Sequence, residues 1–143
     1  MDWGERRIGL ALSDESQLLA QPLTTLTRRT GKRFPMARLL ALAKEREVAG
    51  VVIGLPLAAD GSEGDAAHQA RALAAEIARL SGLSAELWDE RFTTARALQA
   101  VREMGGTTRG RQADVDALAA TLLLQHYLDA RRASAERGMR NAE

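Results

Sequence analysis

Residues 2–14 read DWGERRIGLALSD, and this stretch decides how the start of the chain folds. From 7 to 13, apolar residues alternate with other types, which is the period-two pattern of a half-buried β-strand. Turn-forming residues follow at 14–17, and 18–26 has the composition of a second strand. The sequence therefore predicts a β-hairpin, with Pro22 marking an edge or a bulge in its second strand.

Strands and helices alternate after this hairpin. The expected elements are a helix over 34–47, a strand over 48–55, a helix over 62–80, a strand over 84–89, a helix from Thr93 or Thr94 to Met104 and a helix over 113–131. This order predicts an α/β fold with a mixed central sheet flanked by helices. We expect one domain over 1–132, followed by a frayed C-terminal tail over 133–143.

Composition narrows the class of protein. The chain has 143 residues, is 45% hydrophobic and contains no cysteine, which predicts a single domain with a real core and no disulfide or thiolate site. No run of apolar residues is long enough for a membrane span, and no signal peptide is visible, so we expect a cytoplasmic protein without a membrane partner. The net charge is only +1, so any nucleic-acid surface has to be a local patch.

Carboxylates stand at the ends of three predicted elements. Asp2 lies just before the first hairpin strand, Glu90 follows the strand over 84–89, and Asp116 lies near the start of the last helix. Hard oxygen ligands that converge from such positions suit a Mg²⁺-dependent phosphodiesterase, in which two metal ions share the carboxylates. Asp114, two residues earlier, is an alternative third ligand.

Each of these acids also has an ordinary structural interpretation. Asp2 could be a terminal turn residue, Glu90 could pair with a neighbouring arginine, and Asp116 could interact with the helix dipole. Arg7 and Arg91 lie beside the proposed ligands and could hold a phosphate by paired hydrogen bonds, or form common ion pairs.

Four segments together resemble the YqgF (RuvX) family, which has the RNase H-like fold of Holliday junction resolvases. The matching segments are 2–14, VIGLPL at 52–57 with DGSE at 60–63, DERFTT at 89–94 and VDALAA at 115–120. The resemblance implies a nuclease that uses Mg²⁺ or Mn²⁺. It implies either 5′ maturation of pre-16S ribosomal RNA or resolution of branched DNA. Carried over by position, the family's acidic residues are Asp2, Glu90 and Asp116.

The chain departs from the family pattern in two places. An apolar strand normally precedes the first aspartate, whereas only Met1 precedes Asp2 here. We therefore expect either a start upstream of Met1 or a sheet without its usual first strand, in which Asp2 would lie on a fraying end. Family members also often carry a basic residue just before the last aspartate. Arg109 and Arg111 could supply that charge to the substrate here.

Two other classes of protein remain open. The Asp-x-Gly start followed by a hairpin also resembles the phosphate loop of actin-like kinases, although 143 residues cannot supply the two domains which that fold needs. A non-cleaving RNA-binding module is the other alternative. The sequence leaves open precursor rRNA or branched DNA as the substrate, and a monomer or a homodimer as the assembly.

Overall fold

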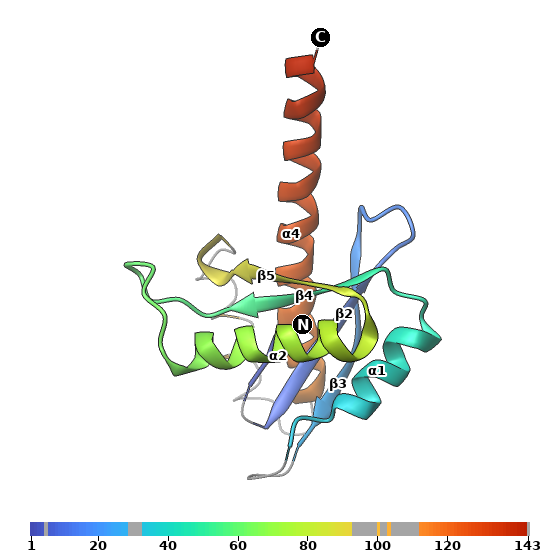
Figure 1. The fold of residues 1–143 in the computed structure, drawn as a ribbon, viewed down its shortest axis with the longest axis vertical. Coiled ribbons are helices and arrows are strands. Elements are labelled where there is room, and N and C mark those ends of the chain that lie inside the picture. The colour runs from blue at the N-terminus through green and yellow to red at the C-terminus, as the bar shows by residue number, and fades with distance from the viewer. Residues whose placement is uncertain (5, 29–32, 93–99, 101–102, 104–111, 143) are drawn as a thin grey trace.

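The computed structural model describes residues 1–4, 6–28, 33–92, 100, 103 and 112–142 (Figure 1). Its elements are β1 (Asp2–Trp3), β2 (Arg7–Ser13), β3 (Ala20–Thr27), α1 (Met36–Glu45), β4 (Gly50–Leu55), α2 (Asp65–Ser81), β5 (Ser84–Asp89), a short 3-10 turn (Glu90–Phe92) and α4 (Gln112–Ala142). The expected helix between Thr93 or Thr94 and Met104 falls mainly outside the described residues, as do Arg109 and Arg111.

The first three strands form an antiparallel sheet in the order β1-β2-β3. The predicted hairpin is confirmed, and its register shifts between Leu10 and Ala11, where the partner changes from Thr24 to Pro22. Because proline has no N–H to donate to the ladder, an irregularity opposite Pro22 is the expected response of the sheet.

The remaining two strands, β4 and β5, pair in parallel, with Gly50 opposite Ser84 and Leu55 opposite Asp89. Met1 connects this pair to the hairpin. Its amine donates to the Val52 carbonyl at 2.6 Å, and the Gly54 amide donates to the Met1 carbonyl at 3.1 Å. These are the two bonds of a parallel ladder centred on Ile53. The strands therefore run β3-β2-β1-β4-β5 as a mixed arrangement, with β1 at the centre.

Helices cover both faces of this arrangement. Helix α4 contacts β1, β2 and β3, whereas α2 contacts β4 and β5. In Figure 1, α2 crosses in front of the strands and the first part of α4 passes behind them. The last turns of α4 extend beyond the body of the molecule, and all residues from Arg131 to Asn141 are exposed.

Two observations differ from the expectations for the chain ends. Asp2 does not fray: it is only 9% exposed and pairs with Gly9 in β2. The strand that holds it, β1, is two residues long. At the other end, α4 continues to Ala142, where we expected a frayed tail from 133 onwards. The segment holds alanine, arginine and methionine, which are strong helix formers, and contains no proline.

Candidate functional site

Asp2 is held at the centre of the sheet by its backbone. On one side it pairs with Gly9 of β2. On the other side, the preceding residue, Met1, is hydrogen-bonded to β4 at Val52 and Gly54. Because strands on both sides fix the backbone, the Asp2 carboxylate occupies a defined and buried position.

Asp116 reaches the same place from α4 through a close backbone contact. A Cβ built on Gly9 would lie 2.0 Å from the Asp116 carbonyl oxygen and 3.1 Å from the Ala117 nitrogen. Only a glycine lets a helix approach a strand this closely. Since Gly9 is also the partner of Asp2, this contact brings the first turns of α4 next to the first acid.

The Asp116 carboxylate forms an ion pair. Its Oδ2 atom is buried and lies 2.8 Å from the Nε atom of Arg7 on β2. The two side chains are 21% and 40% exposed, respectively, so the pair lies at the boundary between core and solvent. Arg7 was expected beside a proposed ligand, and the structure places it there in contact with Asp116.

Glu90 approaches β1 from the side of β4, whereas Asp116 approaches it from the side of β2. It follows β5 directly, and a Cβ on Gly54 would lie 2.7 Å from its Oε1 atom. Gly54 itself is bonded to Met1. A second glycine in a strand thus makes room for a carboxylate, next to the strand to which Met1 is bonded.

The pKa of the Met1 amine is affected by both Asp2 and Glu90. Burial is the largest effect and lowers its pKa to about 6, while the negative charges of Asp2 and Glu90 act in the opposite direction and raise it. Coulombic effects of this kind fall off with distance and with solvent screening. Both carboxylates therefore lie within interaction range of one buried nitrogen.

Asp2, Glu90 and Asp116 offer hard oxygen atoms, the donor type that Mg²⁺ and Mn²⁺ prefer. However, among the residues that the structure describes, no group of three acidic or histidine side chains is arranged to hold a metal ion. The side chain of Asp114, the alternative third ligand, is outside the described set. The chemistry of the donors fits a divalent cation, and the described side chains do not form the ligand cluster.

Arg91 is bound to the protein itself. Its Nε and Nη2 atoms hold the Asp89 carboxylate as a fork, at 3.1 and 2.8 Å, and Nη1 reaches the Ala59 carbonyl at 3.4 Å. Asp89 also accepts the Arg91 backbone N–H at 2.9 Å, so its role here is structural. Hydrogen bonding to Arg91 is the main reason why the pKa of Asp89 lies below its ordinary value.

Sequence reasoning missed the two glycines that shape the site. Gly9 and Gly54 each interrupt a strand pattern, which is a known sign of close backbone approach and could have identified them. It also missed Tyr127, which donates a hydrogen bond to Glu86. The ring of Tyr127 lies edge-to-face with that of Trp88, with centroids 5.7 Å apart. Trp88 packs against Ala119 and Leu123, so it is part of the core.

No helix in the described part of the chain is both long and apolar enough to cross a membrane.

Comparison with known proteins shows which family the chain is similar to. The model of the family described as "RuvX: Holliday junction resolvase" matches residues 1–130. A protein of Anaeromyxobacter sp. (strain Fw109-5) is 45% identical over 133 residues, which cover 93% of this chain and 96% of the relative. Relatives from Myxococcus xanthus, 42% identical, and Ruegeria pomeroyi, 40% identical, cover 92% and 90% of this chain and 87% and 83% of their own lengths. All three are named "Putative pre-16S rRNA nuclease". The match extends over nearly the whole chain, so the chain belongs to the RuvX (YqgF) family.

Proposed function

We propose that the protein is a metal-dependent nuclease which cuts the phosphodiester backbone of structured nucleic acid, with precursor 16S rRNA as its substrate. One observation carries the proposal. Two strand glycines lie on either side of β1, which holds Asp2. Gly9 of β2 lets the backbone of Asp116 approach, and Gly54 of β4 lets the side chain of Glu90 approach. The names of the relatives support the choice of substrate.

Asp2, Glu90 and Asp116 would hold Mg²⁺ or Mn²⁺ in this proposal. The ion would supply Lewis acidity towards the scissile phosphate and a water of lowered pKa. The protein supplies placement: β1 fixes Asp2 from both edges, and the Gly9 contact fixes the start of α4. Asp114 remains the alternative to Asp116.

Arginines would bind the substrate's phosphates. Arg7 lies beside Asp116, is 40% exposed and presents a planar fork that matches a phosphate. We retain Arg91, Arg109 and Arg111 as proposed contacts, with Arg91 the least available because Asp89 occupies its fork. The catalytic domain would span 1–132, and an rRNA precursor as substrate would place the protein in the cytoplasm.

Resolution of branched DNA is the second candidate, because the description of the matching family names Holliday junctions. A four-way junction has two-fold symmetry, so this activity would favour a homodimer, whereas trimming of RNA is compatible with a monomer. Solution mass measured together with cleavage of both substrates separates the two activities.

The test compares Glu90→Gln with Glu76→Gln. Both replace a carboxylate with an amide, but Glu76 is on the exposed face of α2, where it pairs with Arg79. Each variant is incubated with Mg²⁺ and either end-labelled pre-16S rRNA or a labelled four-way junction. Glu90→Gln should lose about a hundredfold or more in rate, since even residues that only orient metal ligands cost roughly 10–100-fold. Glu76→Gln should cleave like the unaltered chain.

Equal cleavage by the two variants would remove Glu90 from the mechanism. If the unaltered chain binds the RNA but cuts neither substrate with Mg²⁺ or Mn²⁺, the protein is a binding module and the proposed function is wrong.

A further inference from the structure

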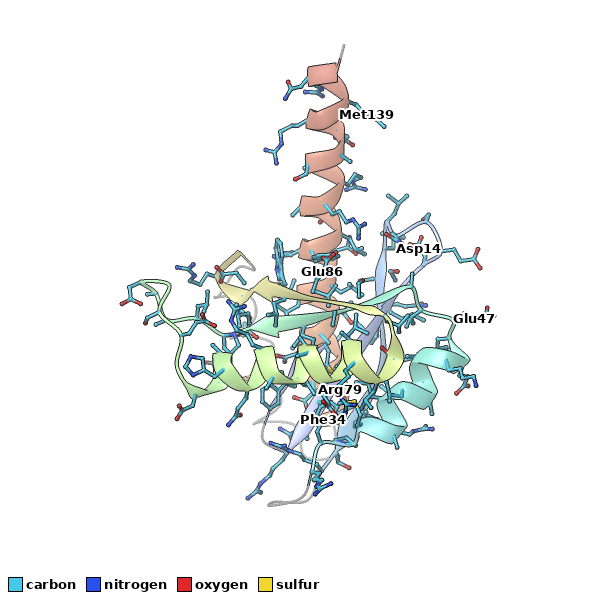
Figure 2. The ribbon with its side chains drawn as sticks, in the orientation of Figure 1. Asp14, Phe34, Glu47, Arg79, Glu86 and Met139 are labelled. Carbon is cyan, nitrogen blue, oxygen red and sulfur yellow. The ribbon has the colours of Figure 1, made fainter. Side chains whose placement is uncertain are left out.

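The last turns of α4 project from the body of the molecule. Every residue from Arg131 to Asn141 is exposed, and the family model, which matches residues 1–130, does not include these turns. Figure 2 labels Met139 near their outer end, where its side chain is 71% exposed. We call residues 131–142 the projecting helix.

Positive charge is concentrated on the projecting helix. It holds four arginines and one glutamate, whereas residues 1–130 hold sixteen basic and seventeen acidic residues. The net charge is therefore +3 on the projecting helix and −1 on residues 1–130. A positive surface on a protein that is otherwise nearly neutral attracts polyanions and speeds their association with that surface.

One of the four arginines belongs to the body of the protein. The Nη1 atom of Arg131 donates to the Tyr127 hydroxyl at 3.1 Å, and this hydroxyl donates in turn to Glu86 of β5. Since Arg131 supports a contact with the sheet, we do not count it as part of a ligand surface.

The other three arginines make only weak contacts with the protein. Arg132 lies 3.3 Å from Asp129, and the two side chains are 50% and 48% exposed. Arg137 donates to a serine hydroxyl at 3.5 Å, and within the described residues neither Arg137 nor Arg140 forms an ion pair. At about 100° per residue, the three occupy an arc of about 140° around the helix, so one elongated anion can contact all of them. We call Arg132, Arg137 and Arg140 the arginine arc.

The side chains of the projecting helix indicate the kind of partner. Its apolar side chains are alanines and Met139, which do not form the stripe that packing against a second helix requires. Guanidinium groups match phosphates, and the phosphates of a nucleic acid repeat along its backbone. An RNA strand therefore fits this helix better than a second copy of the chain.

The distance along α4 indicates which part of the RNA is bound. The helix runs without a break over Gln112–Ala142 and carries Asp116 of the candidate site. At 1.5 Å per residue, Arg132 and Arg140 lie about 24 and 36 Å from Asp116 along the helix axis. Successive phosphates of a duplex strand lie about 3.4 Å apart along the axis, so these distances correspond to roughly 7–11 nucleotides.

We propose that the arginine arc binds phosphates of the RNA that flanks the cleavage site, at roughly 7–11 nucleotides from it. This contact rests on the proposed function, because it takes RNA as the substrate and Asp116 as part of the site. It favours precursors with a long flank over short fragments. Binding is measured without divalent cations, so the test is independent of cleavage.

The test compares two triple variants that lose the same charge. One combines Arg132→Gln, Arg137→Gln and Arg140→Gln. The control combines substitutions at exposed positions of α1 and α2, or next to α1, namely Arg38→Gln, Arg46→Gln and Arg79→Gln. The ligands are pre-16S rRNA fragments that extend about 20 or about 4 nucleotides to each side of the mature 5′ end, in EDTA at about 50–200 mM salt.

The arginine-arc variant should bind the long fragment about tenfold more weakly than the unaltered chain, as expected for three exposed ion pairs. The slope of log K against log salt should become shallower by about 2, since each phosphate contact contributes about 0.7. The short fragment should bind equally to both chains, and the control variant should stay within about twofold of the unaltered chain. Glu136→Gln removes the one acid of the projecting helix, so it should tighten binding of the long fragment.

Several results would overturn the proposal. Equal losses for the two triple variants would show that only net charge matters, and equal losses on the two fragments would place the arginine arc at the cleavage site. A larger loss on a four-way DNA junction than on the long RNA would contradict RNA as the partner. A dimer that the arginine-arc variant converts to a monomer would assign the projecting helix to a second copy of the chain. By contrast, a chain that binds the long fragment through the arc but cuts nothing with Mg²⁺ would support this contact and refute the proposed function.

Discussion

Replacement of Gly9 by alanine tests the contact on which the candidate site depends. A Cβ at this position would lie 2.0 Å from the Asp116 carbonyl oxygen and 2.4 Å from its carbonyl carbon. Both atoms belong to the backbone of α4, so no side-chain rotation can relieve the clash. Even a separation of 3.0 Å, which real Cβ atoms essentially never undercut, would require α4 to withdraw from β2 by about 1 Å.

The cost of that withdrawal can be bounded. Insertion of one methyl group into a packed core typically costs 1–3 kcal/mol, and a contact between two backbones belongs near the upper end, at about 2–3 kcal/mol. For a chain of this length, 1 kcal/mol corresponds to roughly 4 °C, so the Tm should fall by about 8–12 °C. Activity should fall further, because a displacement of about 1 Å near reacting groups can cost on the order of a hundredfold.

The assay pairs Gly9→Ala with Gly138→Ala. Gly138 lies on the exposed end of α4, where nothing lies within 4 Å of a built Cβ, so this control adds the same methyl group without a clash. Tm and Mg²⁺-dependent cleavage are measured for both variants. If Gly9→Ala unfolds within about 2 °C of the control, α4 does not rest on β2 at this point and the assembly of the acids around β1 has been misjudged.

Two further predictions concern the Met1 amine and the Arg91 guanidinium. The pKa of the Met1 amine is about 6 in the folded chain, against an ordinary value of 8.0. Between pH 6 and 8 the unfolded chain therefore binds more protons than the folded chain. The free energy of unfolding should rise with pH by roughly 2–3 kcal/mol across this window. Urea titrations should show this rise for the free amine and not for an N-acetylated chain, and equal slopes would contradict the burial of the amine. Arg91→Lys keeps the charge but loses the two parallel hydrogen bonds to Asp89 and the contact with Ala59. Proteolysis within 58–63 should become faster, while the Tm falls by only a few degrees. Unchanged proteolysis would show that Arg91 does not hold this loop.

Local patterns in the sequence predicted most of the elements. The alternation over 7–13 became β2, the apolar run over 48–55 contained β4, and the helix expected over 62–80 became α2 over Asp65–Ser81. The proline in the hairpin correctly marked an irregular register. Each of these features depends on a few neighbouring residues, which is why periodicity and turn chemistry were sufficient.

Features that depend on distant residues were not predictable in the same way. The sequence suggested a loose Asp2, because only one residue precedes it, whereas Met1 is held by Val52 and Gly54, about fifty residues away. The end of α4 was set too early, because the change from an apolar to a polar pattern near 131 resembled the end of a helix. Local propensity without packing was enough to continue it.

The ion pair between Arg7 and Asp116 connects the two halves of the proposed activity. The contact is short, at 2.8 Å, and it lies at the boundary between core and solvent, with Arg7 40% and Asp116 21% exposed. In the proposed function Asp116 would exchange this partner for a divalent cation, which would keep a positive charge beside its buried Oδ2 atom. The same exchange would release the Arg7 guanidinium at the point where a phosphate would arrive, so binding of metal and binding of substrate would favour each other.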